Sequence, residues 1–174
     1  MIFALFYFLL GMASIVVQAA VSEYFNAWLG ARPDPMALIV VYLGLQRGKE
    51  SGLIGGFILG LLQDVLSGGL LGANALSKGL IGHATGCLRR NVTGREALFH
   101  AILVAIASAF NAALLVFLLF IFLPDVPVTS YYWVEAGKTT LLNTFLAPLL
   151  IGLLVGAEER IAPAAAGSPY PEKS

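Results

Sequence analysis

The stretch Gly56–Leu76, with the sequence GFILGLLQDVLSGGLLGANAL, decides how this chain folds. It lies within a longer apolar region that is rich in glycine, and Gly68-Gly69 interrupts that region near its centre. Because paired glycines favour a break between regular elements, the pattern predicts a helical hairpin. Its two helices are expected from about Ser51 to Ser67 and from about Gly72 to Arg89.

The composition around this hairpin is that of a membrane protein. Apolar residues make up 59% of the 174-residue chain and charged residues only 11%, whereas soluble domains have roughly 45–50% and 25%. Ten basic residues balance ten acidic ones, so no net charge attracts nucleic acid. The single cysteine, Cys87, cannot form an internal disulfide. The lipid bilayer is therefore the expected surroundings, and nucleic acid is not an expected partner.

Further apolar segments flank the hairpin on both sides. Crossing the hydrocarbon core takes about 20 residues of helix, and Ile2–Val21 and Ala97–Leu123 meet this requirement. Leu141–Ala157 reaches a full span when it is extended back through Lys138, whereas Met36–Leu45 is only ten residues long. The fold class is therefore predicted to be an all-α polytopic membrane protein with a bundle of six transmembrane helices.

Lysine and arginine near the ends of the spans indicate which ends face the cytoplasm. With six spans, the cytoplasmic basic residues are Arg47, Lys49, Arg89, Arg90, Arg95, Arg160 and Lys173, and the external ones are Arg32 and Lys138. A five-span alternative, in which residues 36–45 do not cross and the N-terminus lies outside, stays open. Both topologies place residues 47–50 and 89–96 inside, residues 124–137 outside and the C-terminus inside.

Two segments are expected to lie outside the spans. Tyr131, Tyr132 and Trp133 come just before the last span and suit an interfacial aromatic belt. Residues 163–174 are rich in Pro, Ala, Gly and Ser and cannot bury enough apolar surface to order themselves. We therefore expect one transmembrane domain, residues 1–162, followed by a disordered cytoplasmic tail.

Glycines recur at a spacing of four residues, which places them on one face of a helix. The helix-packing candidates are Gly52, Gly56, Gly60, Gly82, Gly86, Gly152 and Gly156. In lipid, small residues at this spacing let two helix backbones approach closely. The spacing alone leaves open whether each face packs within the chain or against another protein.

Asp64 is the most informative polar residue, because an ionisable group in a membrane segment is costly without a partner. Lys78 is the predicted partner, since it lies one turn beyond Asn74 on the following helix. An interhelical pair or a loop cap that holds the hairpin is the main interpretation. Proton or ligand coupling, and a position at the interface with little consequence, are the alternatives.

No catalytic or metal-binding motif is present in the sequence. Gly137-Lys138-Thr139 lacks the preceding glycine of a phosphate-binding loop. His83 and His100 lack ligands at the spacing of a metal site, and no G-x-S-x-G pattern accompanies a serine. The sequence therefore predicts no enzymatic activity, no metal and no cofactor.

The central region resembles the MreD family of rod shape-determining proteins. That family has a Pro-led apolar helix, then a Gly-rich helix ending in G-x-x-x-D-x-x-S-G, then Leu-Gly opening the next helix. The matching residues here are Pro33, Gly60, Asp64, Ser67, Gly68, Leu71 and Gly72. Lys78 departs from the pattern, since the corresponding helix is usually apolar in this family. The detailed match covers roughly residues 32–90.

The resemblance implies six spans in the bacterial inner membrane and cytoplasmic termini. It implies a non-catalytic part in cell elongation and peptidoglycan synthesis, with an MreC-like bitopic protein, an MreB-type filament and peptidoglycan synthases as partners. It also implies a fold similar to the substrate-binding subunits of energy-coupling-factor vitamin transporters, and such a subunit is the alternative function. A solute site needs several convergent polar groups, and the spans offer few beyond Asp64, Asn74, Lys78 and Asn143. The interaction protein is therefore favoured.

Overall fold

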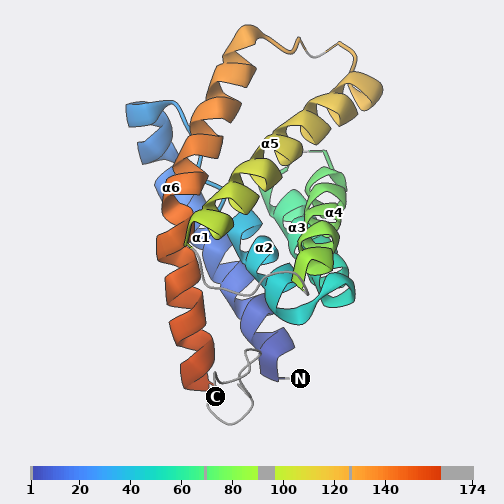
Figure 1. Ribbon diagram of the computed structural model, residues 1–174. Coiled ribbons are helices and arrows are strands. Elements are labelled where there is room, and N and C mark those ends of the chain that lie inside the picture. Colours follow the sequence, from blue (N-terminus) through green and yellow to red (C-terminus); the bar gives the residue numbers. More distant parts are fainter. Residues whose placement is uncertain (1, 69, 90–96, 126, 162–174) are drawn as a thin grey trace.

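The computed structural model describes residues 2–68, 70–89, 97–125 and 127–161, and these ranges form six α-helices (Figure 1). The helices are α1 (Ile2–Leu29), α2 (Pro35–Arg47), α3 (Lys49–Ser67), α4 (Ala73–Leu88), α5 (Ala97–Phe122) and α6 (Ser130–Ile161). Their number and order agree with the sequence prediction. The predicted tail, residues 163–174, and most of the predicted 89–96 loop lie outside the described residues.

The central helix of the bundle is α2, which contacts each of the other five helices. Asp34 caps its N-terminus, with Oδ1 accepting from the Ala37 backbone N–H at 3.2 Å, and Pro35 occupies the first turn. Nine consecutive residues, Met36–Gly44, are buried. Because thirteen helical residues span only about 20 Å, α2 is shorter than the roughly 30 Å hydrocarbon core. It is therefore a core helix surrounded by protein.

The closest helix pair is the hairpin of α3 and α4, where glycines bring the two backbones into contact. A Cβ atom on Gly52 would overlap the Gly82 carbonyl, and one on Gly56 would overlap the Lys78 carbonyl. A Cβ atom on Gly60 would overlap the Asn74 carbonyl in the same way. These glycine faces are therefore used in packing within the chain.

Three helices are long and apolar enough to cross a membrane, as the composition predicted. They are Leu5–Leu29 of α1, Leu98–Phe122 of α5 and Ser130–Ala157 of α6, with mean hydropathy of 1.9, 2.6 and 1.9. At most 28% of each span is buried inside the protein. Long apolar helices with so much exposed surface are stable only in lipid, so the chain is a membrane protein.

The ends of two long helices differ from the sequence prediction. Helix α1 continues past Val21 to Leu29, because the polar residues that follow Val21 remain helical. Helix α6 begins at Ser130, so Tyr131 and its aromatic neighbours belong to the first turn of α6 and not to the preceding loop. Tyr132 is held there because its hydroxyl donates to the Ala112 carbonyl of α5 at 3.3 Å.

Candidate functional site

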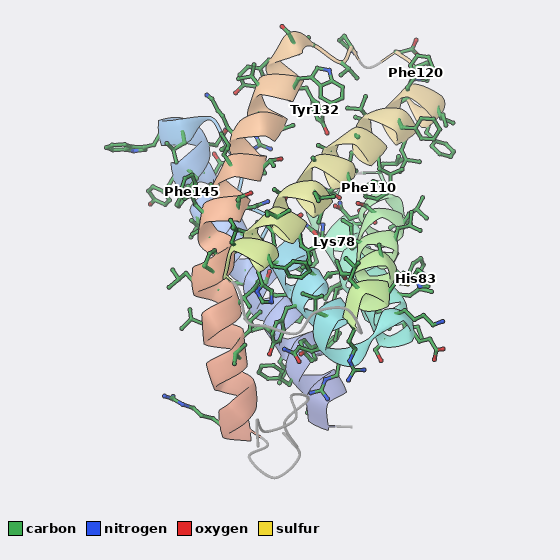
Figure 2. All side chains as sticks on the ribbon, viewed as in Figure 1. Lys78, His83, Phe110, Phe120, Tyr132 and Phe145 are labelled. Atoms are coloured by element: carbon green, nitrogen blue, oxygen red, sulfur yellow. The ribbon has the colours of Figure 1, made fainter. Side chains whose placement is uncertain are left out.

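Polar side chains from five helices or helix ends converge inside the bundle. We call them the polar cluster: Asp34, Asp64, Asn74, Lys78, Ser108 and Asn143. Lys78 is completely buried and Asp64 is 2% exposed. Figure 2 shows Lys78 in the interior of the bundle, on α4. This concentration of buried polar groups is the candidate functional site, because ionisable residues within apolar helices are costly to retain.

The Asp64 carboxylate caps the N-terminus of α4 from the end of α3. Oδ2 accepts from the backbone N–H groups of Gly72 at 2.9 Å and Ala75 at 3.1 Å. Oδ1 accepts from the backbone N–H of Asn74 at 3.1 Å and from its side-chain Nδ2 at 2.9 Å. Gly72 occupies the N-cap position and has no side chain to accept these hydrogen bonds. Asp64 therefore supplies the cap that α4 lacks.

Two glycines shape the turn that lets Asp64 reach α4. Gly68 ends α3 with φ of 66° and Gly72 precedes α4 with φ of 93°, both in the left-handed region that other residues rarely adopt. Ser67 contributes a hydrogen bond from Oγ to the Asp64 carbonyl at 3.4 Å. The Asp-x-x-Ser-Gly pattern thus ends α3 in a turn that brings the start of α4 within hydrogen-bond distance of the Asp64 carboxylate.

Lys78 does not pair directly with Asp64, so this part of the sequence prediction was wrong. Its Nζ donates to Asp34 Oδ2 at 2.9 Å, forming an ion pair, and to Asn74 Oδ1 at 3.0 Å. Asn74 accepts from Lys78 with its carbonyl oxygen and donates to Asp64 with its amide nitrogen. The side-chain amide of Asn74 therefore lies between Lys78 and Asp64 and links them through two hydrogen bonds.

Asp34 and Ser108 are the residues of this site that sequence reasoning missed, and Asp34 is the one that carries a charge. Its setting, Pro33-Asp34-Pro35 before an apolar run, is a helix-start signal and explains the cap on α2. Nothing in that pattern indicates that the other carboxylate oxygen meets a lysine 44 residues later in the chain. Pro33 itself is buried at this junction.

Asn143 extends the polar cluster to the last two helices. Its Oδ1 accepts from the Asp34 backbone N–H at 3.0 Å, and its Nδ2 donates to Ser108 Oγ at 3.0 Å. Nearby, Ser77 Oγ donates to Asn111 Oδ1 at 2.6 Å and joins α4 to α5. Hydrogen bonds of these side chains therefore connect α2, α3, α4, α5 and α6.

The polar cluster has a structural role, because its hydrogen bonds are made within the protein and hold the helices together. Both oxygens of each carboxylate accept hydrogen bonds from groups of the protein, and the amides of Asn74 and Asn143 each donate and accept within it. A ligand would have to replace these internal hydrogen bonds. Among the described residues, no group of three or more His, Cys, Asp or Glu side chains is placed to hold a metal ion.

The predicted packing glycines of α6 have different surroundings from those of α3 and α4. No heavy atom lies within 4 Å of a Cβ built on Gly152 or Gly156. Around them Phe145, Leu149 and Leu153 are 81%, 62% and 61% exposed, and Figure 2 shows Phe145 pointing away from the bundle. We call these five residues the α6 glycine face. On the isolated chain four of its residues are exposed, and Gly156 is half-buried.

Comparison with known proteins gives one match. A family model described as rod shape-determining protein MreD matches residues 1–155, which extends from α1 into the last turns of α6. No curated protein and no solved structure matches the chain.

Proposed function

Because the chain belongs to the MreD family of rod shape-determining proteins, we propose that it is a non-catalytic component of the cell-elongation machinery in the bacterial inner membrane. It acts there by binding other membrane proteins, first of all an MreC-like bitopic protein, and through it the MreB-type filament and the peptidoglycan synthases. The observation that carries this proposal is the length of the family match, which covers nearly all of the described bundle. The match is not confined to the central motif.

The division of the glycine faces supports binding through α6. The packing glycines of α3 and α4 lie against backbone of the facing helix, whereas a Cβ atom on Gly152 or Gly156 would have no heavy atom within 4 Å. In lipid, helix association depends on close packing at small residues because the hydrophobic effect does not drive it. A single membrane-spanning helix of a partner protein fits the α6 glycine face on these grounds.

The arrangement of the helices supports the six-span topology with both termini in the cytoplasm. Consecutive helices run in opposite directions, so α1 begins and α6 ends at the same end of the bundle (Figure 1). The α2–α3 turn with Arg47 and Lys49, and the end of α4 with Arg89, lie at that same end. Clustering of basic residues favours this end as the cytoplasmic one.

Depletion and co-purification test the proposal together. In a rod-shaped host, loss of the protein should produce round, widened cells, and gentle detergent extraction should recover it with an MreC-like protein. Gly152→Leu should reduce this recovery at normal abundance, because a side chain at that position points into open space on the isolated chain.

Gly137→Leu is the matched control, since Gly137 is equally open and lies on the same helix but outside the α6 glycine face. Equal loss of partner from both variants would show that the face is not the binding surface. Unchanged cell shape on depletion, with a new requirement for an external vitamin, would establish a transporter subunit instead.

A further inference from the structure

A cavity lies at the end of the bundle opposite the Asp64 turn, where the α2–α3 turn meets the last turn of α4. Its volume is about 330 Å³, and the described residues that line it are Gly48, Lys49, Gly86, Cys87 and Arg89. Neither the polar cluster nor the α6 glycine face contributes to it. Its function is therefore a separate question from partner binding.

Two glycines, Gly48 and Gly86, contribute backbone to the lining of this cavity. Gly48 has φ of 88°, which lets the chain reverse between α2 and α3 without a side chain. A Cβ atom on Gly86 would overlap the backbone of Gly48 and Lys49, so α4 packs directly on the turn. A Cβ on Gly48 would lie 3.3 Å from Arg89 Nη1, which places the guanidinium group beside the turn. The cavity is thus lined both by glycine backbone and by two long cationic side chains.

Among the described residues that line the cavity, the charged ones are Lys49 and Arg89, and both are positive. Both are exposed, and within the part of the chain that the structure describes neither forms an ion pair. Glu50 is the neighbouring acidic residue, but it does not line the cavity. The first turn of α3 begins here without a side-chain cap, so its partial positive charge adds to that of the two side chains.

We propose that this cavity binds a phosphate-bearing anion, the phosphodiester of an anionic lipid headgroup or a soluble phosphate ester. A planar guanidinium and an ammonium group are the side chains that recognise phosphate oxygens. Basic pockets between membrane helices at the cytoplasmic side are suited to anionic headgroups. The volume of the cavity is sufficient for a phosphate group with its substituents.

Cys87 provides a direct measure of occupancy, because it is the only cysteine of the chain, is exposed and lines the cavity. Purified full-length protein is placed in nanodiscs of phosphatidylcholine or of phosphatidylglycerol, and its rate of modification by uncharged N-ethylmaleimide is measured. A third sample contains phosphatidylcholine and millimolar inorganic phosphate. Native mass spectrometry of the same samples counts retained lipid.

Slower modification in phosphatidylglycerol alone identifies a lipid headgroup as the ligand. Slower modification with inorganic phosphate as well identifies a site for soluble phosphate esters. Lys49→Gln and Arg89→Gln should each weaken protection about fivefold, since one basic residue near an anionic surface contributes about 1 kcal/mol. Arg160→Gln, an exposed basic residue of α6 that does not line the cavity, should leave protection unchanged. Equal rates in all three samples, or protection that survives both lining variants, would overturn the proposal.

Discussion

The ion pair between Lys78 and Asp34 offers the sharpest test of the structure. Lys78→Met keeps the length of the apolar stem but removes the ammonium group that donates to Asp34 and Asn74. Lys78 is completely buried and the Asp34 side chain is only 12% exposed, so the pair is largely shielded from solvent. Breaking a buried pair by removing one partner costs about 3–5 kcal/mol. We expect a loss of that size in the free energy of unfolding.

The second variant of the double-mutant cycle removes the negative charge of Asp34. Asp34→Asn should cost a similar amount, because it leaves the ammonium group of Lys78 without its counterion, although asparagine can still cap α2. The double variant has no unpaired charge, so its cost should fall short of the sum by at least about 2 kcal/mol. Reversible unfolding in mixed detergent micelles measures all three free energies.

Additivity of the two changes within about 0.5 kcal/mol would refute the ion pair. Combining Lys78→Met with Asp64→Asn is the internal comparison, because these two residues meet only through Asn74. The coupling energy between Lys78 and Asp64 should be smaller than that between Lys78 and Asp34. Lys138→Met, at an exposed position of α6, controls for the general effect of losing a positive charge.

Three further predictions follow from the hairpin and the topology. Asp64→Leu leaves three backbone N–H groups at the start of α4 without their acceptor and should lower the free energy of unfolding by about 1–3 kcal/mol or more, measured in the same micelles. Gly56→Ala should destabilise by about 1–3 kcal/mol because its Cβ overlaps a backbone carbonyl, whereas Gly79→Ala, whose Cβ would meet its nearest neighbours at 3.5 Å, should be nearly neutral; equal effects would contradict the close α3–α4 approach. Alkaline phosphatase fused after Asp125 should be active and after Gly48 inactive, and the reverse result would invert the topology.

The helices were predictable from sequence because hydropathy and glycine breaks are local signals. The lengths of the helices were less predictable. Helix α1 continues through the polar residues after Val21, where no proline or glycine ends it. The position of α2 could not be predicted, because ten apolar residues are equally consistent with a short span and with a core helix. Only the contacts of the other five helices decide between these.

The candidate site shows the same division. The Asp64 turn is encoded within twelve residues, so the sequence suggested a loop cap before the structure described it. The ion pair joins a residue of α4 to a residue just before α2, and nothing in the local Pro33-Asp34-Pro35 pattern indicates such a distant partner. Long-range pairing of this kind depends on the tertiary fold. The same limit left the internal and external glycine faces indistinguishable.

The hydrogen bond between the Asp34 backbone and Asn143 also sets a minimum time for biosynthesis. The two residues are 109 positions apart, and chains are synthesised at about 5–20 residues per second. Asp34 therefore waits roughly 5–20 s after its own synthesis before Asn143, its partner on α6, has been made. A chain that stops before α6 leaves the Asp34 backbone N–H and the Ser108 hydroxyl without their shared partner, Asn143.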